Sequence, residues 1–409
     1  MAYIERGGNA RRRGLSRSAV RVVILVAAGL MLASIPVASL VGVQFTYTVR
    51  TVAAGGFLLG ALSGAIGSFA VLRKQSLIGD ALSHAALPGV GIAFLIAGRE
   101  LGPLLIGAAI ASLLGVGFLS LVTRMTRIKQ DGAMGIVLAG WFALGIGILA
   151  FIQRRPDASQ AGLDTFIFGQ AASMVAADVQ LLAIVGTAML ALLFANWKEF
   201  KLITFDPEFA KANGYAVGLV TALLLGLNVV AVVMGLQLAG VVLMVGLLIA
   251  PGIAARQWTN RLEQMVLLAA IIGATSGGIG AITSALDTDL PTGPMIIITV
   301  SLFVALSLLF APGRGVIWRA LQRRRDRVRY AGANVRKTAY RYGVSHGDAQ
   351  APVSEEFLTG VLGPVAKQGV RQLCERDELS KSKDGYRLTA SGVARARDHE
   401  QRGGSDGFA

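Results

Sequence analysis

Cysteine is almost absent from this sequence of 409 residues, which contains only Cys374. A single thiol excludes an internal disulfide and a metal site built from several thiolates. The sequence also lacks a C-x-x-C pair, a Walker A pattern and a glycine-rich dinucleotide loop. Nothing in the chain therefore predicts nucleotide binding. If the protein's function depends on ATP hydrolysis, the ATPase should be a separate polypeptide.

Charged residues are also scarce, at 15% of the chain, where a soluble protein carries about 25%. Hydrophobic residues make up 54%, and they gather in repeated runs of about 20, the length that spans a bilayer as an α-helix. The formal charge of +15 lies mainly in residues 1–21, in short loops and in the last hundred residues. Basic loops are typical of the cytoplasmic side. These features predict an all-α polytopic membrane protein of the inner (plasma) membrane.

We predict about ten transmembrane helices, with nine as the alternative count, and place both termini in the cytoplasm. The expected spans are 22–43, 51–72, 80–97, 104–122, 134–152, 173–195, two within 217–255, 265–285 and 295–310. The first run follows a basic cytoplasmic segment, 1–21, and could be a signal peptide. Its apolar core is longer than the usual 7–15 residues, which favours a retained helix. The run 217–255 is long enough for two spans, and we expect it to break near residues 235–237.

Two polar residues stand inside the third apolar span. Asp80 and His84 are four residues apart and therefore share one face of a helix. Ionisable groups within a membrane are costly and usually face the bundle interior or a transport pathway. A carboxylate oxygen and an imidazole nitrogen also suit a divalent transition metal. We interpret the pair as a metal-handling point. The alternative is a helix N-terminus capped by Asp80, with His84 as a hydrogen-bonded core histidine.

The loop 197–215 should contain a short helix outside the membrane. Asp206 is a suitable N-cap, Pro207 suits the first helical position and Gly214 suits the C-terminal cap. We expect the helix to run from Pro207 to Asn213. Its Phe209 could contact a soluble partner, or it could anchor an ordinary loop helix at the membrane interface.

The C-terminal hundred residues differ in character. Residues 313–345 are rich in arginine and predict a basic linker helix, for which contact with anionic membrane lipid is the simplest role. Residues 346–409 predict a small cytoplasmic domain with winged-helix order, because two helical patterns precede a hairpin signal at Asp384-Gly385 and a further helix. Many such domains bind no DNA, so a small soluble cap is the alternative.

Three motifs resemble those of the ABC-3 family of metal-importer permeases, over about residues 45–312. The sequence VLRKQSLIGDALSHAALPG at 71–89 resembles the family signature. The stretch that begins FDPE at 205 and reaches Gly214 resembles the family's ATPase-coupling segment, and DLPTGP at 289–294 resembles its last outer turn. The resemblance implies Asp80 and His84 as metal ligands along the pathway. It also implies ATPase coupling through 205–214, including Phe205, Asp206, Pro207, Glu208, Phe209 and Gly214.

The same resemblance implies import of a divalent metal that an extracytoplasmic solute-binding protein delivers and a separate ABC ATPase subunit drives. Such permeases pair with a second permease subunit, identical or related, so that two Asp80/His84 pairs could converge on Mn²⁺, Fe²⁺ or Zn²⁺. The ligand types favour manganese, then iron or zinc, and no permanently bound cofactor is expected. The alternative function is a transporter or channel that needs no ATPase, which replacement of Glu208 and Phe209 would discriminate.

The tail resembles the winged-helix part of diphtheria-toxin-repressor-like, iron-dependent regulators over residues 333–400. The motifs that carry this resemblance are TAY at 338–340, LCER at 373–376 and YRLTASG at 386–392. It implies a DNA-binding or regulatory module, with Lys367 and Arg371 as the residues that would contact DNA.

Overall fold

The computed structural model describes residues 46–75, 77–98, 100–154, 174–287, 290–312 and 314–404, together with residues 24 and 29. The chain divides into two compact units, Met1–Gly315 and Val316–Ala409. The predicted first span, 22–43, lies outside the described residues apart from two isolated positions. The predicted count of ten spans therefore cannot be compared in full with the described residues.

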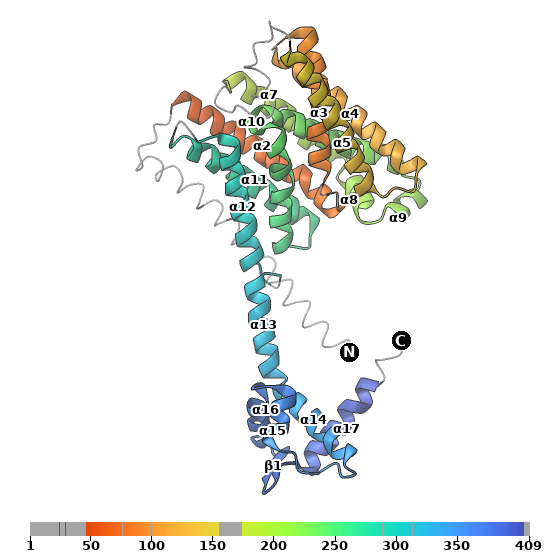
Figure 1. Ribbon diagram of the computed structural model, residues 1–409, viewed down its shortest axis with the longest axis vertical. Helices are drawn as coiled ribbons and strands as arrows, with labels where there is room; N and C mark the ends of the chain where they lie inside the picture. The colour runs from red at the N-terminus through yellow and green to blue at the C-terminus, as the bar shows by residue number, and fades with distance from the viewer. Residues whose placement is uncertain are drawn as a thin grey trace. The chain divides into compact units, whose positions relative to one another are not determined.

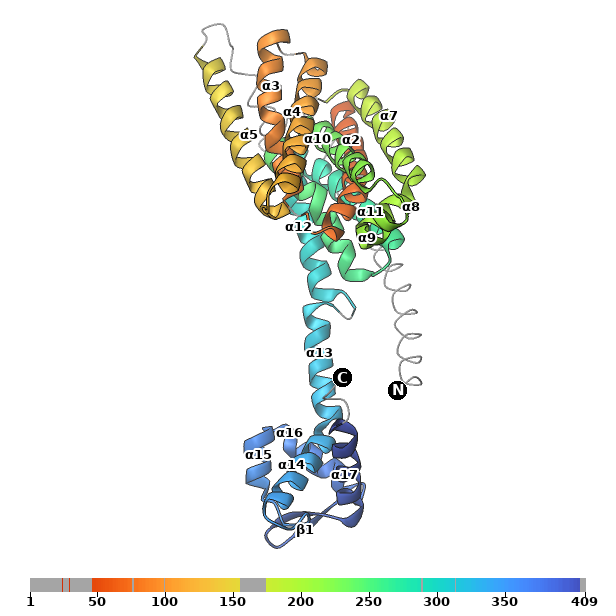
Figure 2. The same cartoon turned by 90° about the vertical axis from the view of Figure 1, so that its right-hand side faces the viewer.

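The first unit is a bundle of helices (Figures 1 and 2). Its helices are α2 (Tyr47–Leu72), α3 (Ile78–Ala97), α4 (Leu101–Met125), α5 (Gln130–Gln153), α7 (Ala176–Ala195), α8 (Trp197–Phe205), α9 (Pro207–Ala212), α10 (Val217–Trp258), α11 (Leu262–Ser284) and α12 (Thr292–Phe310). Within the described residues, eight helical segments are long and apolar enough to cross a membrane. The membrane-spanning helical fold is thus confirmed. The observed bounds agree closely with the predicted ones. The largest differences are four residues, at the starts of α2 (Tyr47 instead of residue 51) and α5 (Gln130 instead of residue 134).

Helix α10 is a helical hairpin, because its backbone turns sharply at Gly240, where φ is 75° and ψ is 171°. Glycine reaches this conformation without the steric cost that a Cβ would add. A Cβ built on Gly235 would lie 2.1 Å from the sulfur of Met244, whereas nine residues of straight helix would separate these positions by about 13.5 Å. The predicted break within 217–255 is present, but it lies at 240 and not at 235–237. Of the two predicted spans there, Val217–Leu236 is long and apolar enough to cross a membrane, and the second span stays a prediction.

Small residues bring α2 and α11 into backbone contact. A Cβ built on Gly56, Gly60 or Gly64 would lie 2.6, 2.0 or 2.2 Å from the carbonyl oxygen of Gly277, Gly273 or Ala269, respectively. The two helices are antiparallel, since the partner numbers fall as the α2 numbers rise. In lipid, no hydrophobic driving force brings helices together, so membrane helices associate through close packing of small residues.

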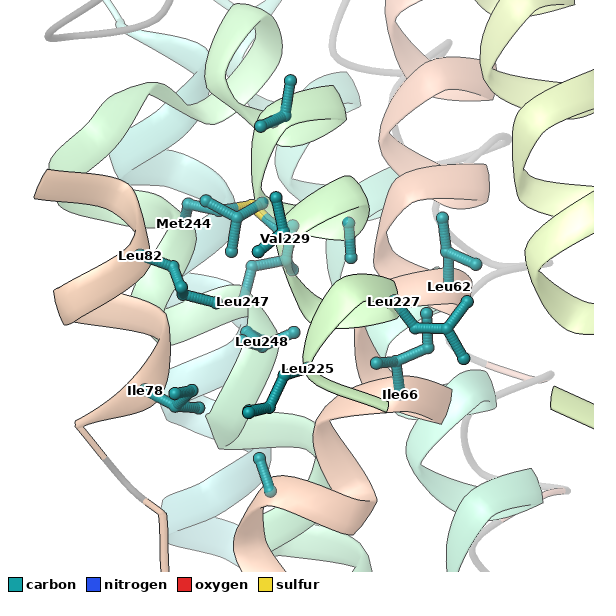
Figure 3. Close-up of a cluster of buried hydrophobic side chains, with 14 of the residues drawn as sticks. Leu62, Ile66, Ile78, Leu82, Leu225, Leu227, Val229, Met244, Leu247 and Leu248 are labelled. Carbon is teal, nitrogen blue, oxygen red and sulfur yellow. The ribbon is translucent and has the colours of Figure 1, made fainter. Parts of the chain in front are cut away.

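The hydrophobic core of this unit lies where α2, α3 and both arms of α10 meet (Figure 3). Leu62 and Ile66 from α2 and Leu82 from α3 are buried there beside Val229 and Leu248 of α10. This packing fixes the position of α3, the helix that carries Asp80 and His84.

The second unit has its own core. It contains α13 (Val316–Arg329), α14 (Ala331–Ser345), α15 (Glu355–Leu362), α16 (Val365–Cys374), β1 (Leu379–Ser382), β2 (Gly385–Leu388) and α17 (Ala390–Gly404). The two strands pair antiparallel, with Leu379 opposite Leu388, so the expected hairpin is confirmed. Val335 and Ala339 of α14 are buried in this core, so α14, which lies in the predicted linker 313–345, packs with the predicted domain 346–409.

Candidate functional site

Helix α3 holds Asp80 and His84 one turn apart. The His84 Nε2 atom lies 3.2 Å from Asp80 Oδ1, and 18% and 32% of the two side chains are exposed. The imidazole also meets the ring of Phe142 from α5 edge to face, with ring centroids 4.8 Å apart. The sequence offered no signal for this contact, because Phe142 lies on another helix. The aromatic ring restricts the orientation of His84 from the side that faces α5.

The separation of the two donor atoms fits one shared metal ion. Two bonds of about 2.1 Å that meet at about 90–109° place their donor atoms about 3.0–3.4 Å apart. The observed 3.2 Å lies within this range. A divalent ion could therefore bind Nε2 and Oδ1 together with little movement of either side chain.

The alternative interpretation of this pair finds no support in the geometry. The residue that caps α3 is Leu77, and no side-chain hydrogen bond caps this helix. Asp80 lies within the first turn of α3, where an acidic side chain interacts favourably with the helix dipole. The Nδ1 atom of His84 is buried without a hydrogen-bond partner. His84 is thus not a fully satisfied core histidine, and buried polar atoms of this kind are uncommon.

The described residues of one chain do not form a complete metal site. Among the described residues, no group of three or more histidine, cysteine, aspartate or glutamate side chains lies close enough to hold an ion. Structural zinc takes four ligands, so two donors leave room for ligands from elsewhere. Of the acids in the outer turn, Asp287 is described and Asp289 lies outside the described residues.

The segment that follows α8 forms the short helix expected from its capping residues. Asp206 Oδ1 accepts a hydrogen bond from the backbone N–H of Phe209 at 2.9 Å, and Pro207 occupies the first turn. Gly214 has a φ of +81°. The helix ends at Ala212, one residue before the predicted end. Phe209 and Phe205 are more than half exposed, so the structure leaves both rings free to contact a partner.

Helix α8 fastens this segment to the bundle. Phe200 is fully buried, and its ring centroid lies 6.1 Å from that of Phe69 on α2, whose ring also meets Trp197 edge to face. At the surface, Lys201 forms an ion pair with Glu263 of α11. Aromatic packing therefore joins α8, the helix that precedes α9, to α2.

The two predicted DNA-contacting residues lie on α16 and are largely exposed. Lys367 lies 4.0 Å from a Glu355 carboxylate oxygen, and Arg371 Nε lies 3.1 Å from Glu375 Oε1. Exposed ion pairs of this kind contribute little stability and break easily. Both cations would nevertheless have to leave a carboxylate before binding a phosphate.

A buried carboxylate in the second unit was not expected from the sequence. Glu378 is fully buried and forms ion pairs with Arg336 of α14 and Arg395 of α17. Burial by itself raises the pKa of Glu378, but the hydrogen bonds and charges of the two arginines outweigh it and hold the pKa below its ordinary value. The three residues are far apart in sequence, so no local pattern identifies them as a cluster.

Comparison with known proteins finds one family and several relatives that are membrane proteins of metal transport systems. A family model described as the ABC 3 transport family matches residues 44–311. The chain is 47% identical over 279 residues to the manganese transport system membrane protein MntC of Bacillus subtilis, covering 68% of this chain and 64% of that protein. It is 45% identical over 280 residues to the zinc transport system membrane protein TroC of Treponema pallidum, covering 68% of this chain and 94% of that protein.

A solved structure agrees. The chain superimposes on a chain of PsaBC from Streptococcus pneumoniae in complex with Fab with a TM-score of 0.60 and 30% identity, covering 69% of this chain and 97% of the other. The family match ends at residue 311, so the second unit, from Val316 onward, lies beyond it. The chain spans just under two thirds of the length of the B. subtilis relative.

Proposed function

Because the chain belongs to the ABC 3 transport family, we propose that it is the membrane-spanning permease subunit of an ATP-driven importer of divalent transition metal. Manganese is the favoured cargo, with iron or zinc next. The observation that carries this proposal is the Asp80–His84 pair on α3, whose donor atoms are spaced to share one ion. A permease moves its cargo without changing it chemically, so we assign no catalytic residue.

Two copies of the pair would complete the site. One chain contributes one carboxylate and one imidazole, so a second permease subunit, identical or related, would raise the set to four donors. Oxygen and nitrogen donors bind Mn²⁺, Fe²⁺ and Zn²⁺ without the very tight hold of thiolates, which suits an ion that must be released. In this arrangement Phe142 would orient His84, and the metal would lie between Nε2 and Oδ1 of each pair.

The ATPase would dock on α9. Support comes from the two exposed rings Phe205 and Phe209, from the rigid N-cap at Asp206 and from the aromatic contacts that join α8 to α2. An extracytoplasmic solute-binding protein would deliver the metal at the opposite face. This orientation puts both termini and the second unit in the cytoplasm and the bundle in the inner (plasma) membrane.

Metal uptake by cells that express the complete transporter tests the proposal. Radioactive manganese, iron and zinc are compared for the wild type, Asp80→Ala and His84→Ala. Uptake of one metal should vanish in both variants, because each removes one of the two donors. His346→Ala, which removes an exposed histidine of the second unit, is the matched control and should transport normally. Normal uptake by a well-expressed His84→Ala protein would remove these residues from the pathway.

Co-purification of the ATPase distinguishes this proposal from the alternative of a transporter or channel that needs no ATPase. The ATPase should accompany the wild-type permease and be lost from the Glu208→Ala/Phe209→Ala variant, because both side chains lie exposed on α9. Metal uptake that continues without any ATPase would favour the alternative function.

We also propose that the second unit is a winged-helix-like regulatory module. The order of α14, α15 and α16, the two-stranded hairpin and α17 supports this. DNA binding through Lys367 and Arg371 is the finer form of the proposal. It predicts DNA binding by the full chain that weakens as salt rises and that falls in Lys367→Ala/Arg371→Ala. Absence of DNA binding at low salt would leave a role in contact with protein or lipid.

A further inference from the structure

A cavity of about 450 Å³ opens where the C-terminal end of α4 meets the start of α5, α9 and the start of α10. Leu119, Val217 and Leu225 form its apolar part. The remaining lining is polar and includes Thr123 and Thr221. The metal pair on α3 does not line it, so the cavity is separate from the proposed pathway site.

The charge of the cavity is positive. Arg124 of α4 and Lys211 of α9 both line it, and no aspartate or glutamate does. Within the described residues, neither cation forms an ion pair with a carboxylate. The nearest acids along the chain, Asp131 and Glu208, lie outside the lining. Two unneutralised cations beside one cavity indicate an anionic occupant.

The geometry around Arg124 strengthens this view. A Cβ built on Gly218 would lie 3.1 Å from Arg124 Nη2, so the guanidinium reaches the first turn of α10. That turn begins after Ala216 and has no side-chain cap. The N–H of Val217 donates to the Tyr215 carbonyl oxygen, but the N–H groups of the next two residues have no partner within the helix and add partial positive charge to the same place. Arginine, lysine and free backbone N–H groups are the donors that proteins commonly offer to phosphate oxygens.

We propose that this cavity binds a phosphate group, carried either by an anionic phospholipid headgroup or by free phosphate. The apolar part suits the glycerol and first methylene groups of a lipid, and Arg124 ends an apolar span, the depth at which headgroups lie. A bound phosphate joins α4, α9 and α10 through one ligand. It thereby holds α9 against the ends of two spanning helices.

The experiment uses the purified full-length transporter complex in two lipid backgrounds. In the first, native mass spectrometry measures retention of phosphatidylglycerol. In the second, the complex is placed in nanodiscs that contain only phosphatidylcholine, and the unfolding temperature is measured with and without inorganic phosphate. The cavity variant is Arg124→Gln/Lys211→Gln. The matched control is Arg127→Gln/Lys129→Gln, which removes the same charge from exposed residues that do not line the cavity.

Loss of both cations should weaken phosphate binding about tenfold or more, since two charge-assisted contacts disappear. If the source is lipid, phosphatidylglycerol is retained by the wild type and the control but not by the cavity variant. If the source is free phosphate, phosphate raises the unfolding temperature of the same two proteins only. Gly218→Leu keeps every charge but fills the space beside Arg124, so it should also block binding.

Equal binding by the wild type and the cavity variant, for both probes, overturns the proposal. So does an equal loss in the cavity variant and the control, because the effect would then come from overall surface charge. The unfolding temperature in phosphatidylcholine alone shows whether each variant is folded. Should the double variant fail to fold, Gly218→Leu decides the question, since it changes no charge.

Discussion

Replacement of Gly60 by alanine tests the packing on which the bundle depends. The added Cβ would lie 2.0 Å from the carbonyl oxygen of Gly273, whereas ordinary contact begins at 3.4 Å. The two helices must therefore separate locally by about 1.4 Å, the difference between these distances. The obstacle is backbone, which cannot rotate away as a side chain would.

The separation also loosens the neighbouring contacts on the same pair of helices, Gly56 with Gly277 and Gly64 with Ala269. Overpacking of this kind costs about 1–3 kcal/mol. A second substitution, Gly273→Ala, meets the same contact from the other side. The double variant should therefore lose less stability than the sum of the two single variants, because the first substitution has already opened the gap.

Thermal unfolding of the purified permease in detergent measures the effect, and Gly140→Ala on α5 is the control. A Cβ on Gly140 has no atom within 4 Å, so this change should be neutral or slightly stabilising through helix propensity. Gly60→Ala should unfold at a clearly lower temperature than the control. Equal unfolding temperatures for the two variants would show that the backbone contact between α2 and α11 does not stabilise the bundle.

Three further predictions concern other parts of the chain. Phe200→Ala should destabilise the bundle by about 3–5 kcal/mol in thermal unfolding, since Phe200 is fully buried, while Phe205→Ala, at a ring 55% exposed, should cost far less. Gly240→Ala should lower the unfolding temperature, because φ at this position is positive. The lowered pKa of Glu378 stabilises the second unit fully above the ordinary value of about 4.3. This contribution is lost as the pH falls through the lower folded-state pKa. Amide exchange in α14 of the intact chain should rise at that pH, and Glu378→Gln should remove the pH dependence at a cost of about 3 kcal/mol.

Sequence reasoning located the spans because the length and apolarity of a run are local properties. It also located the helix that begins at Pro207, because Asp206 caps a backbone N–H only three residues away. The hairpin between β1 and β2 follows the same rule, with its turn signal at Asp384-Gly385. In each case the interacting groups are neighbours in the chain, so the sequence contains the whole interaction.

The same reasoning predicted part of the arrangement of Asp80 and His84. Spacing predicted that Asp80 and His84 share a face, and the structure joins them at 3.2 Å. The contact of His84 with Phe142, and the burial of its Nδ1 atom without a partner, depend on how α3 packs against α5. No spacing rule reaches from one helix to another.

The sequence by itself therefore determined the membrane-spanning class, the helix ends and the residue types available for metal. Only the tertiary structure decided that α10 reverses at Gly240, that Glu378 joins arginines from α14 and α17, and that Arg124 and Lys211 line one cavity. The physical reason is the distance along the chain over which each kind of interaction acts. Capping, helical periodicity and turn preference act within about four residues, whereas these contacts join residues brought together only when the helices pack.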